Sequence, residues 1–146
     1  MFSVSLTIRP IRPDEHEIVR RLLLDNGGQG VRFEPSAFET LIENARESLV
    51  AIEDGRVVGF ARALGDGCFN GYLSMLVVDA KFRKRGVGRA LVERVMGDNA
   101  DMTWVLRAAR PDVQGFYEKL GFQMSTVAME RARRPATKDI SKGATS

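Results

Sequence analysis

The residues best suited to chemistry form a basic, glycine-bearing segment between an apolar run and an amphipathic run, with the spacing Arg83-x-x-Gly86-x-Gly88. The first N–H groups of a helix lack intrahelical partners and carry the positive end of the helix dipole, so a phosphate can bind them directly. Glycines, which have no Cβ, let a bulky phosphate approach the backbone. The segment predicts a polyphosphate site made of Arg83, Lys84, Arg85, Gly86, Val87, Gly88 and Arg89.

Two familiar phosphate-binding motifs do not fit this segment. A P-loop needs Gly-x-x-x-x-Gly-Lys followed by Ser or Thr, and no Ser or Thr follows the basic run. A dinucleotide-binding fingerprint needs a small residue at position 91, where the chain has Leu91. Because a glycine pair alone is a weak signal, a helix start with solvated charges remains an alternative at this point.

A second segment, Phe116-Tyr-Glu-Lys-Leu-Gly-Phe122, follows a strand-like run at 103–107. Asp112 is placed to cap a helix that starts near Val113, and Gly121 can supply the left-handed position that ends it. Together, the two segments resemble the GNAT superfamily, the GCN5-related N-acetyltransferases. The resemblance covers roughly residues 5 to 131, and the run Phe60 to Asn70 resembles the branch with arylamine (serotonin-type) acetyltransferases.

The resemblance implies an enzyme that uses acetyl-CoA as co-substrate, without a metal. The residues 83 to 89 would hold the pyrophosphate, and a splayed strand at Leu76, Val77 and Val78 would pair its backbone with the pantetheine arm. Arg110 stands where the family commonly has an asparagine that binds the cofactor. Tyr117 would be the acid that protonates the departing thiolate, since a phenol with a pKa of about 10 stays protonated at neutral pH. A core tyrosine is the alternative for this position.

The general base is left open by the sequence. No acid lies between Asp66 and Asp79, where many relatives carry a strand carboxylate. Glu53, Glu34 or a chain of ordered waters could deprotonate the amine. His16 lies among charges at a helix start and is expected at the surface, and nothing near Cys68 would lower its thiol pKa.

We expect direct transfer of the acetyl group to a primary amine. Phe33, Phe69 and Tyr72 fall on or beside the loops expected at the acceptor side, with Ser74 on the adjoining strand, which favours a small, aromatic amine. Acetylation of a protein N-terminus or lysine is the alternative acceptor class. The alternative outside the enzymes is a sensor that binds acyl-CoA without catalysis, which the missing strand carboxylate favours.

Composition restricts the partners. The chain has 146 residues, is 44% hydrophobic and 28% charged, and has one cysteine, which predicts one soluble domain without a disulfide or metal cluster. Neither a membrane-length apolar run nor a signal peptide is visible, so a cytoplasmic location without membrane association is expected. Residues 131–146 have a net charge of +4, so residues 1–130 carry −1 of the total +3, the body is nearly neutral and no nucleic-acid function is expected. A homodimer is left open.

The order of elements predicts an α/β (α+β) fold with a mixed, mostly antiparallel sheet of six to seven strands flanked by about four helices. A single domain over 1–131 and a flexible basic tail over 132–146 are expected. Asp14 and Ser36 are predicted helix caps, and Asp54-Gly55 predicts a tight hairpin. The predicted strands cover 5–9, 48–53, 56–64, the run ending at 79, 103–108 and a final hairpin over 122–131.

Overall fold

The computed structural model describes residues 5–27 and 33–134. The chain divides into two compact units, Met1–Ala109 and Arg110–Ser146. Each unit is described by itself below. The predicted domain boundary at residue 131 stays a prediction, and residues 135–146 of the expected tail lie outside the described part.

The first unit is built on a five-stranded sheet with the order β1-β2-β3-β4-β5. The first four strands pair antiparallel, and β4 and β5 pair parallel. The predicted hairpin is confirmed, because Asp54 and Gly55 both have the positive φ that a tight turn between strands requires. The strands are β1 (Leu6–Pro10), β2 (Glu47–Glu53), β3 (Arg56–Gly65), β4 (Asn70–Val78) and β5 (Thr103–Leu106).

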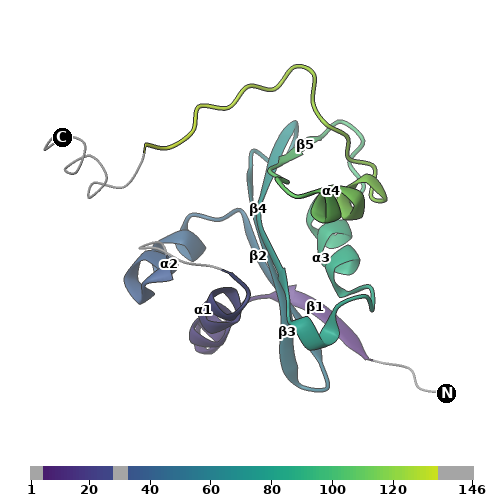
Figure 1. Cartoon of the computed structure of the whole chain (residues 1–146). Helices are drawn as coiled ribbons and strands as arrows, with labels where there is room; N and C mark the ends of the chain where they lie inside the picture. The colour runs from purple at the N-terminus through teal and green to yellow at the C-terminus, as the bar shows by residue number, and fades with distance from the viewer. Residues whose placement is uncertain (1–4, 28–32, 135–146) are drawn as a thin grey trace, which may run out of the picture. The chain divides into compact units, whose positions relative to one another are not determined.

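Helices cover both faces of this sheet, as Figure 1 shows, with α1 and α2 on one side and α3 on the other. Phe38 of α2 and Val19 of α1 pack with Phe60 and Val77 of the sheet in one buried cluster. On the opposite face, a Cβ at Gly59 would lie 3.0 Å from Leu91 Cδ1, so the missing side chain lets α3 approach β3 closely. The helices of this unit are α1 (His16–Asp25), α2 (Pro35–Glu43) and α3 (Val87–Met96), with short 3-10 turns η1 (Pro13–Glu15) and η3 (Ala80–Phe82).

The predicted helix caps are wrong in position. Asp14 lies inside η1, and Ser36 lies inside α2, whose N-cap is Glu34. Proline is favoured in the first helical position, because its missing N–H would have no partner there, and Pro13 and Pro35 therefore start these elements earlier.

The second unit contains α4 (Pro111–Glu118). Its N-cap is Arg110 rather than the predicted Asp112, since Pro111 again takes the first position. Gly121 has a φ of 96°, which confirms the predicted left-handed position after the helix.

The final hairpin expected over 122–131 is absent from the described residues, so the sheet has five strands rather than six or seven. Met124, Val127 and Met129 are largely exposed, so the segment has no apolar face that burial would stabilise as strands. The hydroxyl oxygen of Ser125 accepts the N–H groups of Val127 at 3.1 Å and Ala128 at 2.8 Å. This local turn competes with a strand ladder for the same donors.

Candidate active site: an open strand edge beside a helix start

The strand β4 loses its partner on one edge halfway along its length. Its parallel pairing with β5 runs from Asn70–Thr103 to Leu73–Leu106. On the other edge, the register with β3 shifts, so that Arg62 pairs with Met75 and Ala63 with Leu73. Ser74 is therefore the extra residue of a bulge, placed where the pairing with β5 ends.

The backbone of 74–78 consequently has a strand neighbour only on the β3 side within the described residues. The predicted pantetheine strand, Leu76 to Val78, lies in this stretch. An unpaired strand edge offers a row of N–H and C=O groups to an extended ligand. These residues can therefore bind through the backbone, as the resemblance implies.

The segment after β4 is shaped by its backbone. Asp79 Oδ1 accepts the N–H of Lys81 at 2.9 Å and starts the turn η3. Lys84 and Gly86 both have positive φ, 63° and 85°. Gly86 is the N-cap of α3, no side chain caps the helix, and a Cβ on Gly86 would meet nothing within 4 Å. The glycine is thus required by the left-handed backbone rather than by crowding.

The helix start leaves room for a phosphate on its open side. Val87 is buried under the sheet, so only its N–H can contribute to the predicted site. The four basic side chains around it, Arg83, Lys84, Arg85 and Arg89, are exposed. Backbone donors, the helix dipole and exposed cations are the combination that an anion such as a pyrophosphate needs.

Three of these cations contact protein groups. Arg83 Nε donates to the carbonyl oxygen of Val78 at 3.1 Å, and its Nη2 donates to Asn26 Oδ1. Arg89 Nε lies 3.1 Å from Glu93 Oε2. Exposed pairs of this kind contribute only about 0 to 1 kcal/mol, so a phosphate can replace them at little cost.

The third contact involves a candidate base. Arg85 Nη1 lies 3.2 Å from Glu53 Oε2, and the Arg85 guanidinium also lies over the Phe82 ring. Glu53 is buried at the end of β2, opposite Arg56. Arg56 starts β3, and Gly59, three residues later, pairs with Val78 at the end of β4. Glu53 therefore lies at the end of the sheet where β4 ends. The carboxylate thus belongs to the phosphate-binding end of the site and positions Arg85, away from the bulge.

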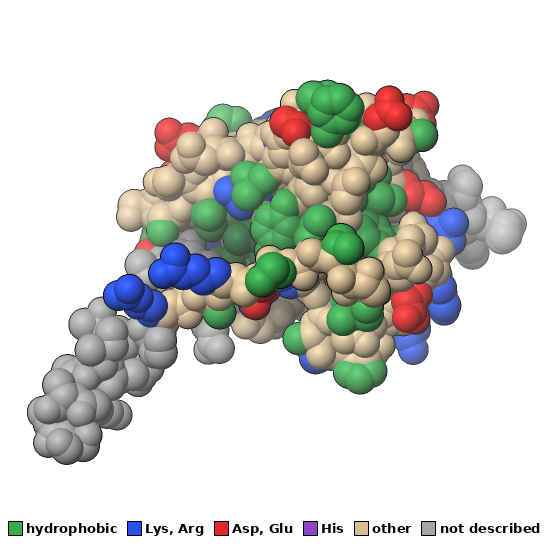
Figure 2. All heavy atoms as spheres, turned by 90° about the horizontal axis from the view of Figure 1, so that it is seen from above, with side chains coloured by type: hydrophobic (Ala, Val, Ile, Leu, Met, Phe, Trp, Pro, Cys, Tyr) green, Lys and Arg blue, Asp and Glu red, His purple; other side chains and the backbone are tan. Residues whose placement is uncertain are grey.

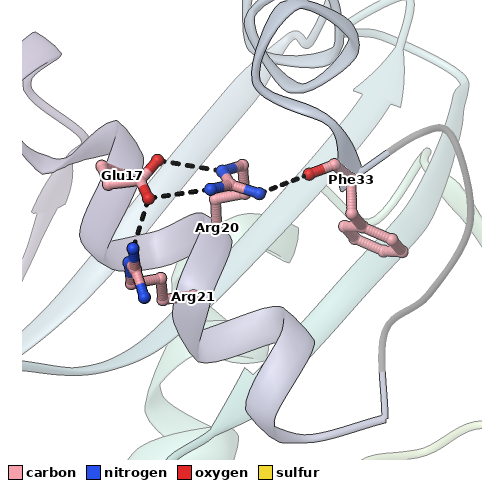
Figure 3. A network of polar contacts seen from close by, with 4 residues as sticks. All are labelled: Glu17, Arg20, Arg21 and Phe33. Atoms are coloured by element: carbon pink, nitrogen blue, oxygen red, sulfur yellow. Dashed lines mark hydrogen bonds and ion pairs between the residues drawn. The ribbon is translucent and has the colours of Figure 1, made fainter.

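The predicted acceptor residues are brought together only in part. The carbonyl oxygen of Phe33 accepts Arg20 Nη1 at 2.9 Å, an arginine that Glu17 also holds (Figure 3). The Phe33 ring is buried in the core cluster. Phe69 is exposed in a turn whose N–H groups are bound by Asp66, and these bonds hold the pKa of the Asp66 carboxyl well below its usual range. An aromatic rim is therefore not assembled, and these two acceptor roles stay predictions.

The other two acceptor residues lie beside a side chain that the sequence reasoning missed. Tyr72 and Ser74 are on β4, and the Ser74 hydroxyl accepts Arg62 Nη1 at 3.0 Å and donates to the Arg62 carbonyl at 3.1 Å. Tyr72 pairs with Leu64, two residues along β3 from Arg62. A signal was present, because Arg62 interrupts the apolar alternation of Val58, Phe60 and Leu64 on one face of a strand.

Within the second unit, the Tyr117 ring packs edge-to-face against Phe116 at 4.9 Å and Phe122 at 5.6 Å between ring centres. Burial raises the pKa of the Tyr117 phenol to about 12. Arg110 is exposed and lies 3.7 Å from Asp112 Oδ1. The phenol is therefore protonated at neutral pH, as a group that donates a proton must be.

Neither a metal centre nor a membrane-spanning helix is found in the described residues. Within residues 5–27 and 33–134, no group of three or more His, Cys, Asp or Glu side chains could hold a metal ion. No helix in the same part of the chain has the length and apolarity to cross a membrane.

The chain is similar in sequence to known acetyltransferases. The family model described as "Acetyltransferase (GNAT) domain" matches residues 44–124. Serotonin N-acetyltransferase 2, chloroplastic, of Oryza sativa subsp. japonica is 42% identical over 77 residues, which cover 51% of this chain and 38% of the rice protein. GCN5-related N-acetyltransferase 1, chloroplastic, of Arabidopsis thaliana is 42% identical over 69 residues, covering 46% and 35%. The matches thus span less than half of these relatives' length.

Solved structures agree in fold. A GNAT family acetyltransferase from Streptococcus pneumoniae superposes with a TM-score of 0.73 at 20% identity, covering 91% of this chain and all of that one. An aminoglycoside N-acetyltransferase in complex with CoA gives 0.70 at 23% identity, covering 92% and 98%. The family model covers more than half of the sequence, including the open edge of β4 and the start of α3. The chain belongs to the GNAT family of acetyltransferases.

Proposed function

We propose that this chain transfers the acetyl group of acetyl-CoA directly to the primary amine of a small acceptor. The observation that carries the proposal is the continuity of β4 with the start of α3, because the open edge at 74–78 leads straight into the basic segment at 83–89. The named relatives are N-acetyltransferases, which supports the same chemistry.

Different residues of this chain would bind different parts of acetyl-CoA. The backbone N–H groups at the start of α3, with Arg83, Lys84, Arg85 and Arg89, would bind the pyrophosphate. The backbone of Leu76, Val77 and Val78 would hold the pantetheine arm by strand pairing. When bound, acetyl-CoA supplies an activated acetyl thioester, so no metal is needed for the transfer.

Proton transfers need an acid and a base. Tyr117 would supply the acid, and its raised pKa keeps the phenol protonated across the neutral range. For the base, the described part of β4 offers no carboxylate, and Glu53 pairs with Arg85. We therefore propose that solvent takes the proton of the amine, so the rate should rise with pH towards the pKa of the acceptor.

One observation favours the sensor alternative. β4 (Asn70–Val78) carries no carboxylate, and Met75 lies opposite Arg62 beside the bulge, so a chain that binds acetyl-CoA without catalysis is the second candidate. If the chain is an enzyme, the alternative acceptor is a protein N-terminus or a lysine side chain.

Release of free thiol from acetyl-CoA, measured with a panel of small amines and of peptides with free N-termini or lysines, tests these functions. We expect release with small amines and CoA binding by calorimetry. Binding without release across the panel would support the sensor. Failure to bind CoA would contradict both functions, and release with peptides alone would move the acceptor to protein.

A further inference from the structure

Arg62 is a buried cation that has no carboxylate partner among the described residues. Its side chain lies on the α1–α2 face of β3, and the residue is only 6% exposed. The Nε atom donates to the carbonyl oxygen of Leu41 at 2.9 Å, and Nη1 donates to the Ser74 hydroxyl at 3.0 Å. None of the ion pairs among the described residues includes Arg62.

This arrangement is costly in a protein that binds nothing there. Burial lowers the pKa of Arg62, yet a guanidinium keeps its proton at any physiological pH. A buried charge that has only neutral partners is poorly compensated for the lost hydration. An anionic ligand would compensate the charge, which gives a physical reason for placing an arginine among core residues.

The guanidinium has donors left for such a ligand. An arginine carries five N–H donors, and two of them are used by Leu41 and Ser74. The fully buried side-chain polar atoms without a partner, among the described residues, are Ser48 Oγ and Trp104 Nε1. Nη2 of Arg62 is not one of these atoms, and no hydrogen bond to a described residue engages it, so its donors are left for a ligand. Two parallel N–H groups at the end of a guanidinium match the two oxygens of a carboxylate.

The location separates this anion from the phosphates of CoA. Arg62 pairs with Met75 beside the bulge, one strand spacing of about 4.8 Å from β4, where its open edge begins. The basic segment follows the opposite end of β4, beyond Val78. An anion bound by Arg62 therefore lies near the strand that would hold the acetyl group and away from the pyrophosphate.

Resting on the acetyltransferase function above, we propose that Arg62 binds a carboxylate of the acceptor. The preferred acceptors are then amines with a carboxylate a few bonds away, as in α-amino acids. Ser74 contacts this guanidinium and Tyr72 pairs with Leu64, two residues along β3, so both would border the same acceptor.

Matched acceptor pairs test the proposal: tyrosine against tyramine, tryptophan against tryptamine, and phenylalanine against phenylalaninamide. The ratio of kcat/KM within each pair is measured for the wild type and for Arg62→Gln. We expect Arg62→Gln to lower kcat/KM for the carboxylate-bearing member at least tenfold more than for its partner. Comparing the ratios between enzymes cancels differences in amine pKa. Arg21→Gln, an exposed arginine of α1, is the matched control and should leave every ratio unchanged.

A second measurement uses only the wild type, so it tests the proposal even if Arg62→Gln does not fold. Calorimetry on the CoA-loaded wild type compares N-acetyltyrosine with N-acetyltyramine, and we expect at least tenfold tighter binding of the former. Equal affinities, or ratios that stay within twofold in a folded Arg62→Gln, would overturn the carboxylate assignment while the acetyltransferase function stands. Thiol release with neither member of any pair would instead overturn the function on which the inference rests.

Discussion

A single tyrosine illustrates how one environment supports two interpretations. The packing of Tyr117 against Phe116 and Phe122, and the raised pKa that burial causes, suit a core residue, while a phenol that keeps its proton at neutral pH is also able to act as an acid. Geometry alone does not choose between these roles, because a buried phenol can serve both. The two roles differ in what the hydroxyl contributes to turnover and to stability.

We predict that Tyr117→Phe lowers kcat roughly 10- to 1000-fold with little change in acetyl-CoA affinity, because the hydroxyl acts only as the thiolate leaves. Steady-state kinetics with an accepted amine, calorimetry and the unfolding midpoint check this. Phe116→Leu is the control, since it loosens the same ring packing without removing a hydroxyl, and should lower stability more than turnover. Unchanged turnover with lowered stability in Tyr117→Phe would assign the residue to the core.

The same variant has a pH signature. The pKa of Tyr117 is raised from 10.0 to about 12, so the unfolded chain loses the phenolic proton at lower pH than the folded chain. The stabilisation is complete below about pH 10 and is lost as pH rises towards 12. The alkaline fall in the free energy of unfolding should therefore be shallower in Tyr117→Phe.

At the scale of elements, the candidate site depends on where two regular structures end. β5 stops pairing at Leu106, and α3 starts at Val87 without a side-chain cap. Both ends leave backbone donors unpaired within the described residues, and backbone groups bind without needing a particular side chain. Most positions of this site can therefore change without loss of binding, whereas the glycines cannot.

Gly88 gives a direct test, because it lies in the first turn of α3 with no left-handed φ, whereas a side chain at Gly86 would strain the backbone by roughly 1–2 kcal/mol. We predict that Gly88→Val weakens CoA binding at least tenfold and leaves circular dichroism and melting cooperativity intact. Met96→Val, at the far end of the same helix, is the matched control. Unchanged CoA affinity in folded Gly88→Val would remove the phosphate role of this helix start.

At the scale of the whole molecule, the net positive charge is concentrated in one stretch of the sequence. Figure 2 shows both acidic and basic side chains on the face drawn, most of them towards the edges of the view. The formal net charge is +3, and residues 132–146 hold four basic side chains and one acid, which accounts for all of it. Net positive charge can therefore produce weak binding to polyanions that is unrelated to the site.

We predict that a chain ending at residue 131 keeps its melting temperature, CoA affinity and thiol release, because the positive charge removed lies outside the proposed site. Weak, salt-dependent binding to duplex DNA, measured by fluorescence anisotropy, should disappear in the truncated chain. Loss of CoA binding on truncation would contradict the predicted domain boundary. DNA binding that survives truncation and high salt would contradict the expectation that no nucleic acid is bound.

Much of this protein is determined by local sequence. The hairpin at Asp54-Gly55, the stop at Gly121 and the strand–loop–helix around Gly86 depend on backbone preferences of a few adjacent residues, so they could be predicted. The predicted helix starts are wrong for a local reason as well, because Pro13, Pro35 and Pro111 take the first helical positions ahead of the predicted capping residues.

The sequence by itself thus determined the family and the backbone of the phosphate-binding segment. Only the tertiary structure decided that β4 carries a bulge at Ser74, that its pairing with β5 ends there, and that segment 122–131 forms no hairpin. It also placed Arg62 between Leu41 and Ser74, and Glu53 against Arg85. The reason is physical: strand register and buried charge depend on partners distant in the chain, and local preference does not encode which distant group will be beside a residue.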